Sequence, residues 1–290
     1  MTFYDIFIAA FADYSFMRRA LVGAMVLSVS MAPIGVFMMI RRMSLAGDAM
    51  SHAILPGVAA GFLVSGLKVF PMMIGGLGAG MIVALLAGGV SRLTIQREDA
   101  SLAAFYLISL SLGVLLVSLK GSSVDLMHVL FGTVLALNDE ALILIASVAT
   151  ATLLTFALIW RPMVAECLDP VFLRSVSGVG PVVHFIFLAL VVLNLVASFQ
   201  AIGTLLAVGL MMLPAAAARF WARRLETLCL TSTLFGVAAS YLGLVASFQL
   251  SVASGPAIVV AAGMIYCLSL LLGPSGLVFS RFAPRRHRVA

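Results

Sequence analysis

Two ionisable residues, Asp48 and His52, lie inside an otherwise apolar stretch of the chain, residues 43–67. Their i, i+4 spacing places both side chains on one face of a helix. Carboxylate oxygens and imidazole nitrogens both bind divalent metal ions, and ionisable groups within a membrane span are candidate functional groups by default. The pair therefore predicts half of a metal site. The alternative is a buried ion pair, with Asp48 capping the start of the helix.

A second carboxylate and imidazole, Asp125 and His128, are spaced i, i+3 in a short loop or interfacial helix. They are secondary candidates for a metal path, and the alternative is a solvated Asp that caps a short helix. His184 stands alone at the start of an apolar run and is predicted to be a satisfied or solvated histidine. In the loop that contains Glu98, the neighbouring Asp99 is predicted to be a solvated helix cap, with contact to a partner protein as the alternative.

The segment 168–178 lies between two apolar runs and carries the markers of a short helix. Asp169 can serve as the N-cap, Pro170 fits the first helical position, and Gly178 fits the C-terminal cap. Two turns are too few to cross a bilayer. An amphipathic helix here could insert into a groove of another protein, and a plain surface helix is the alternative. The apolar face of this helix carries Phe172, Leu173 and Val176.

The composition indicates what surrounds these residues. Of the 290 residues, 63% are hydrophobic and only 10% are charged, whereas roughly a quarter are charged in an ordinary soluble domain. The mean hydropathy is +1.21. A soluble fold of this size cannot hide so much apolar surface, so we predict an all-α polytopic membrane protein. Soluble enzymes, nucleic-acid binders and disordered scaffolds are excluded as classes.

The apolar runs give the number of crossings, since each needs about 20 residues. Residues 43–67 provide one crossing, and the longer runs 175–218 and 227–280 have room for two each. Four further runs carry no charge: 20–40, 69–91, 100–119 and 141–160. The sum is nine spans, or eight if one segment is re-entrant. We predict one transmembrane domain over 17–275, an N-terminal interfacial segment over 1–16, and a basic tail over 276–290.

The basic residues gather in clusters between these runs. Nine spans would place most clusters on one side, which the positive-inside rule assigns to the cytoplasm, with the N-terminus outside and the C-terminal tail inside. These clusters are Arg41-Arg42, Arg92 with Arg97, Arg161 with Arg174, Arg219 with Arg223-Arg224, and the tail from Arg281. The net charge of +6 is then explained by the basic loops on the cytoplasmic side and does not indicate a nucleic-acid partner. The sequence lacks the GxxxxGK[ST] phosphate loop, so the chain is not expected to be an ATPase or another enzyme.

The sequence from Arg41 to Val58, RRMSLAGDAMSHAILPGV, resembles the signature of the permease subunits of bacterial zinc/manganese ABC importers. The resemblance covers about residues 15–275. Further matches follow in chain order: Glu98-Asp99-Ala100, Leu130-Phe131-Gly132, Asp169-Pro170 with Gly178, Ala201 to Leu206, Pro214 to Arg219, and Ser254-Gly255.

This resemblance implies a fold similar to the vitamin B12 and siderophore importer permeases, in the bacterial inner membrane. It implies three kinds of partner: a second permease copy, cytoplasmic ATP-binding subunits, and a periplasmic or lipid-anchored protein that delivers the metal. No cofactor is expected on this chain itself. Asp48 and His52 match the family's expected metal ligands. The segment 169–178 matches the helix that seats in the ATPase, with the contact residues Asp169, Pro170, Phe172, Leu173, Arg174 and Gly178.

The donor types bear on the choice of metal. A homodimer would bring two Asp48–His52 pairs together, and two nitrogen and two oxygen donors suit tetrahedral Zn²⁺. Mn²⁺ prefers more oxygens and six ligands, so zinc is favoured and manganese is next. The alternative cargo for an ABC permease of this kind is a metal chelate. An ion-coupled secondary transporter is an alternative class, but it predicts inverted repeats and more intramembrane carboxylates. An intramembrane hydrolase would need Ser51 beside His52, and adjacent helical residues do not face each other.

Overall fold

The computed structural model describes residues 9–66, 68–119 and 137–278, and all regular secondary structure in these ranges is helical. Eight helical segments are long and apolar enough to cross a membrane. In chain order the helices are α2 (Ala9–Asp13), α3 (Ser15–Ile40), α4 (Ala46–Ala53), α5 (Leu55–Ser65), α6 (Val69–Leu93), α7 (Glu98–Leu119), α9 (Asp139–Leu168), α10 (Pro170–Val176), α11 (Gly180–Ile202), α12 (Thr204–Ala218), α13 (Leu225–Leu250) and α14 (Ser254–Leu272). The prediction of an all-α protein with eight to nine spans is confirmed.

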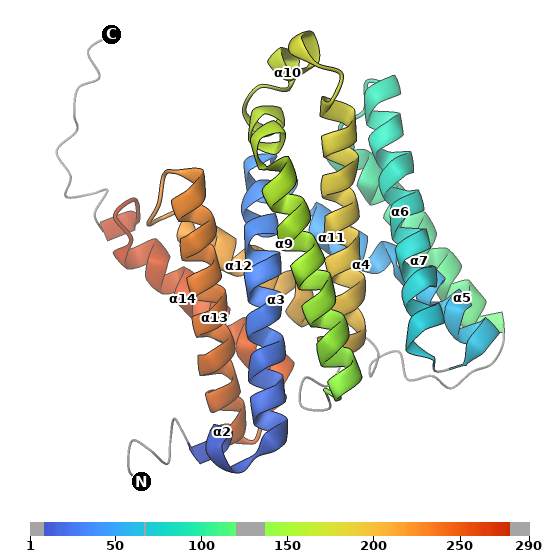
Figure 1. Cartoon of the computed structure of the whole chain (residues 1–290). Helices are drawn as coiled ribbons and strands as arrows, with labels where there is room; N and C mark the ends of the chain where they lie inside the picture. The colour runs from blue at the N-terminus through green and yellow to red at the C-terminus, as the bar shows by residue number, and fades with distance from the viewer. Residues whose placement is uncertain (1–8, 67, 120–136, 279–290) are drawn as a thin grey trace, which may run out of the picture.

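One shorter apolar helix, α12, crosses the bundle in addition to the eight long segments. It has 15 residues and is therefore only ~22 Å long. It runs parallel to α14, because Gly209 of α12 packs on Val259 of α14 and the residues that follow the two helices, Phe220 and Gly273, also lie together. Successive traverses thus alternate in direction, and α2 lies at the opposite end of the bundle from the end of α14 (Figure 1). A helix shorter than the hydrocarbon core, about 30 Å thick, is accommodated because α3, α13 and α14 pack around it.

The apolar run 43–67 supplies one of the eight candidate spans, as predicted, and this span is built from two consecutive helices. α4 ends at Ala53, and α5 begins at Leu55 with Pro56 in its first turn. Proline has no N–H and its ring obstructs the preceding turn, so a continuous helix is interrupted there. The hydroxyl of Ser109, on α7, donates to the Ala53 carbonyl at 2.9 Å across the break.

Glycines allow α5 and α6 to approach closely. The α-carbon of Gly57 faces the backbone of Gly75, and Gly61 faces the backbone at Pro71 and Met72, so neither position leaves room for a β-carbon. Small residues spaced by four have this role at membrane helix contacts. The two helices therefore form a tight antiparallel pair beside α7.

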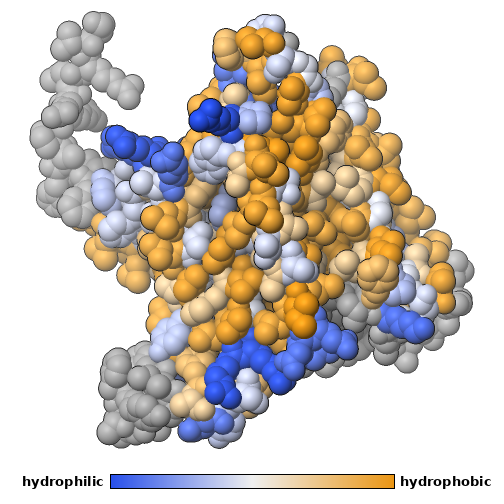
Figure 2. All heavy atoms as spheres, viewed as in Figure 1, coloured by the Kyte–Doolittle hydropathy of each residue, from blue (hydrophilic) through white to orange (hydrophobic). Residues whose placement is uncertain are grey.

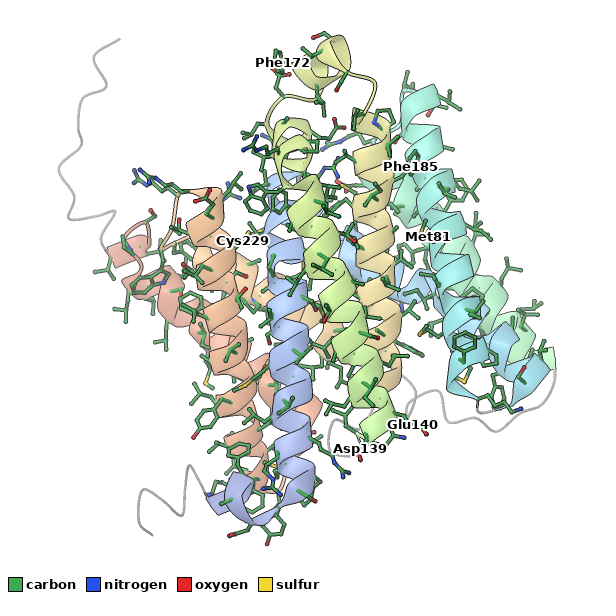
Figure 3. All side chains as sticks on the ribbon, in the orientation of Figure 1. Met81, Asp139, Glu140, Phe172, Phe185 and Cys229 are labelled. Carbon is green, nitrogen blue, oxygen red and sulfur yellow. The ribbon has the colours of Figure 1, made fainter. Side chains whose placement is uncertain are left out.

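The surface is sorted by polarity along the bundle. Figure 2 shows hydrophobic residues over the sides of the bundle and hydrophilic residues gathered towards its two ends. One polar end holds the connections next to α10, and the other holds the start of α9 with Asp139 and Glu140 (Figure 3). This distribution matches a multi-pass membrane protein with lipid against its sides.

Candidate functional site

Helix α4 presents Asp48 and His52 on one face. The Nε2 atom of His52 lies 3.8 Å from Oδ1 of Asp48, and the two side chains are 32% and 65% exposed, respectively. The other six residues of α4 are buried. The helix begins at Ala46 without a side-chain cap, so the alternative of Asp48 as a buried N-cap is wrong. The pair lies on the face of α4 that the described part of the chain covers least.

The packing of α4 explains why this face is open. A β-carbon on Gly47 would meet the methyl group of Met211, which shows that α4 lies directly against α12. The Ser51 hydroxyl is turned inward along the helix and donates to the Asp48 carbonyl at 2.7 Å. Helices α6, α7, α11 and α12 all pack against α4 and bury its other residues, whereas Asp48 stays exposed and His52 is half-buried.

His52 is held from one side by an aromatic ring. The ring centroids of His52 and Tyr106 of α7 are 6.2 Å apart, with the planes inclined by 31°. The Nδ1 atom of His52 is buried and has no hydrogen-bond partner within the described part of the chain. In residues 9–66, 68–119 and 137–278, no cluster of three or more His, Cys, Asp or Glu side chains could hold a metal ion. The site on α4 therefore offers two donors per chain.

The short helix expected at 169–178 is present as α10, which stands beyond the ends of α9 and α11 (Figure 1). The predicted N-cap is confirmed, because Oδ1 of Asp169 accepts from the Phe172 N–H at 2.9 Å, and Pro170 is the first helical residue. Gly178 as the C-terminal cap is wrong, because the helix ends at Val176 and the extended residue Ser177 is the cap.

The exposed apolar face of α10 differs from the predicted one. Phe172 and Val176 are 58% and 68% exposed, and Leu168 beside them is 69% exposed, whereas Leu173 is buried. Phe172 lies at the outer edge of the molecule, on α10 (Figure 3). Leu173 therefore anchors α10 to the bundle and cannot contact a partner in this arrangement. The other predicted contact residue, Arg174, has no described side chain, and the secondary metal-path candidates, Asp125 and His128, lie outside the described residues.

Near α10, the structure brings together four ionisable residues that the sequence did not group. The Nε2 atom of His184 lies 2.8 Å from Oε1 of Glu98, and Nη2 of Arg41 lies 3.9 Å from Oε1 of Glu166. The prediction of a satisfied histidine at His184 is confirmed. The prediction that Asp99 is a solvated cap is wrong, because α7 already begins at Glu98 and one carboxylate oxygen of Asp99 is buried.

Comparison with known proteins agrees with this architecture. Residues 13–273 match the model of the ABC 3 transport family. The chain is 33% identical over 268 residues to the "Manganese import system permease protein ScaB" of Streptococcus parasanguinis, covering 92% of this chain and 94% of that protein. It is 32% identical to the "Manganese transport system membrane protein MntC" of Halalkalibacterium halodurans, covering 93% and 91%.

Two solved structures share the fold. PsaBC from Streptococcus pneumoniae in complex with Fab matches with a TM-score of 0.83 and 30% identity, over 95% of this chain and 98% of that chain. An inward-facing putative metal-chelate type ABC transporter matches with a TM-score of 0.64 at 18% identity, over 87% and 83% of the two chains, which supports the fold alone. The chain is therefore a membrane permease of the ABC 3 transport family.

Proposed function

We propose that this chain is the permease subunit of an ATP-driven importer, and that it moves a divalent metal ion past Asp48 and His52. The observation that carries this proposal is the Asp48–His52 pair, which is open on the one uncovered face of α4. Ionisable groups at membrane depth mark ion pathways. A carboxylate and an imidazole on adjacent turns are suited to a bare cation.

A second copy of the chain would complete the site. One chain supplies one oxygen-donor and one nitrogen-donor side chain, which is too few for a protein-held divalent ion. Two chains meeting at the Asp48 face would supply two of each. The high exposure of Asp48 in the single chain supports this arrangement, because a carboxylate at membrane depth needs a partner or water.

Manganese is the proposed cargo, with zinc next. Two carboxylates and two imidazoles suit zinc as a four-coordinate set, and the same set with bound waters reaches the six ligands that Mn²⁺ prefers. The names of ScaB and MntC, which the chain resembles along nearly its whole length, both specify manganese. For these reasons we propose manganese as the cargo, although the number of donors alone favours zinc.

The end of the bundle that carries α10 is proposed to face the cytoplasm. The α3–α4, α6–α7 and α12–α13 connections lie at this end (Figure 1) and each contains arginine, and positive charge favours the cytoplasmic side. The exposed Phe172 and Val176 would then insert into a groove of the ATP-binding subunit. A metal-binding protein would deliver the ion at the opposite end, where α2 lies.

The test is manganese uptake by proteoliposomes that contain this chain, its ATP-binding subunits and its metal-binding protein. The variants Asp48→Ala and His52→Ala are expected to assemble and to lose uptake by at least about tenfold, because each removes one of two ligands per chain. Glu226→Ala is the matched control, since Glu226 is an exposed carboxylate in the first turn of α13, away from α4 and from α10. Uptake at the wild-type rate in both site variants would refute the assignment of the metal site.

A further inference from the structure

Two ion pairs join four helices at the α10 end of the bundle. Arg41, directly after α3, pairs with Glu166 of α9, and their side chains are 10% and 4% exposed. His184 of α11 pairs with Glu98, the first residue of α7, and the His184 side chain is 4% exposed. Withdrawing ionisable groups from water costs several kcal/mol per ion unless they are paired and hydrogen-bonded. Their retention in so apolar a protein calls for a role beyond packing.

Each pair has one member directly beside α10. Glu166 lies in the last turn of α9, and only Asp169 separates α9 from α10. His184 lies in the second turn of α11, which starts after the short connection from α10. Leu173 of α10 is buried, and α10 contacts both α9 and α11. A displacement of α10 would therefore move Glu166 and His184 first.

The other member of each pair lies beside the metal-binding helix. Only four residues, 42–45, separate Arg41 from α4, whose first residue is Ala46. Glu98 begins α7, which packs along α4 and holds it through the Ser109 hydroxyl and the Tyr106 ring. The two ion pairs thus connect the flanks of α10 to the two segments that position Asp48 and His52.

The ion pairs have room to rearrange. They line a cavity of about 1000 Å³ at this end of the bundle. The Nη1 atom of Arg41, Oε2 of Glu166 and Oδ1 of Asp99 are buried without a hydrogen-bond partner in the described residues. The guanidinium of Arg41 also lies over the ring of Phe187, 5.2 Å from its centroid. An ion pair with unpaired polar atoms beside a cavity can exchange partners without unpacking the apolar core. Such a pair can therefore adopt two discrete arrangements, which coupling between distant sites requires.

We propose that the Arg41–Glu166 and His184–Glu98 pairs are positioning residues that transmit movement of α10 to α4, and so to the metal-binding pair. This inference rests on the proposed function, in which α10 receives force from an ATP-binding subunit. The pairs touch neither the ion nor ATP. Their role is to couple hydrolysis to the state of the site.

The chain contains a matched control for this proposal. Helices α3 and α9, which the Arg41–Glu166 pair joins at one end, are joined at their other ends by Arg19 and Asp139, whose Nε and Oδ1 atoms are 3.0 Å apart. These two side chains are 43% and 71% exposed. The same helices are therefore bridged twice by the same chemistry, once beside α10 and once far from it (Figure 3).

The experiment compares two charge-neutral double variants in the assembled complex. Removing both members of a buried pair avoids an uncompensated buried charge, so the Arg41→Gln/Glu166→Gln variant is expected to fold and assemble. Manganese uptake and ATP hydrolysis are measured in the same proteoliposomes, loaded with Mn²⁺ through the metal-binding protein. We expect ATP hydrolysis to persist while the metal transported per ATP falls roughly fivefold to tenfold. The Arg19→Gln/Asp139→Asn variant should keep the wild-type ratio.

Three outcomes would overturn the proposal. They are a wild-type ratio in the Arg41→Gln/Glu166→Gln variant, an equal fall of the ratio in both double variants, and loss of ATP-binding subunits from the purified complex. The last would show that the pair is only structural. Failure of the proposed function would look different, because the wild-type complex itself would not move manganese and Asp48→Ala would change nothing.

Discussion

The Nε2 atom of His52 and Oδ1 of Asp48 are 3.8 Å apart, which is too far for a hydrogen bond. Neither group is thus saturated by the other, although they occupy adjacent turns of α4. Both side chains reach the open face of the helix, where they remain available to a third group. Their exposure distinguishes this pair from the Arg41–Glu166 ion pair, whose side chains are buried and whose paired atoms are 3.9 Å apart.

The donor set predicts how metal preference will respond to substitution. Asp48→His would give two assembled chains four imidazoles and no carboxylate at the site. Imidazole suits zinc and carboxylate suits manganese, so manganese uptake should fall by about tenfold or more relative to zinc uptake. Competitive uptake of the two ions by cells that depend on this permease measures the ratio. An unchanged ratio would show that Asp48 does not touch the ion, and Glu226→His on α13 serves as the control.

The N-cap of α10 predicts that loss of the Asp169 side chain weakens binding of the ATP-binding subunits. The Asp169 side chain accepts from the Phe172 N–H, and removal of such a cap costs about 1 kcal/mol. Asp169→Ala should therefore loosen α10 and lower co-purification with the ATP-binding subunits, whereas Asp169→Asn, which can still accept the bond, should retain it. Ser175→Ala on the same helix should have no effect. Equal recovery from all three variants would contradict a role for α10 in docking.

The contact between Gly180 and Glu166 predicts a second way to disturb the Arg41–Glu166 ion pair. A β-carbon at position 180 would approach Oε2 of Glu166 to 2.6 Å and displace the carboxylate. Gly180→Ala should lower metal transported per ATP without removing any charge. Gly89→Ala is the control, because a β-carbon there meets nothing within 4 Å. Normal coupling in Gly180→Ala would indicate that the position of the Glu166 carboxylate does not matter.

The close contact between α5 and α6 predicts a stability defect. A β-carbon at Gly57 would clash with the backbone carbonyl of Gly75, which cannot move aside as a side chain can. Overpacking of this kind costs about 1–3 kcal/mol, so Gly57→Ala should lower the thermal unfolding temperature of the purified protein. Gly78→Ala on α6 faces open space and should leave it unchanged. An unfolding temperature equal to the wild type in Gly57→Ala would refute the tight packing.

The buried ion pairs cannot be predicted from the sequence. Arg41 and Glu166 are far apart in the chain and no local pattern links them, so the sequence predicts a basic loop at Arg41 and no role for Glu166. The available signal is a carboxylate, Glu166, six residues beyond the charge-free run 141–160. His184 was correctly expected to be satisfied, but its partner, Glu98, could be identified only after α7 and α11 were placed together.

The sequence alone determined the membrane location, the approximate spans and the shared face of Asp48 and His52. Bilayer thickness requires about 20 apolar residues per crossing, and the helical period aligns residues four apart. The tertiary structure decided the close contact of α5 with α6, the burial of the short helix α12, and the ion pairs beside α10. These features depend on which helices become neighbours, because the approach of two backbones and the pairing of distant charges arise only from packing.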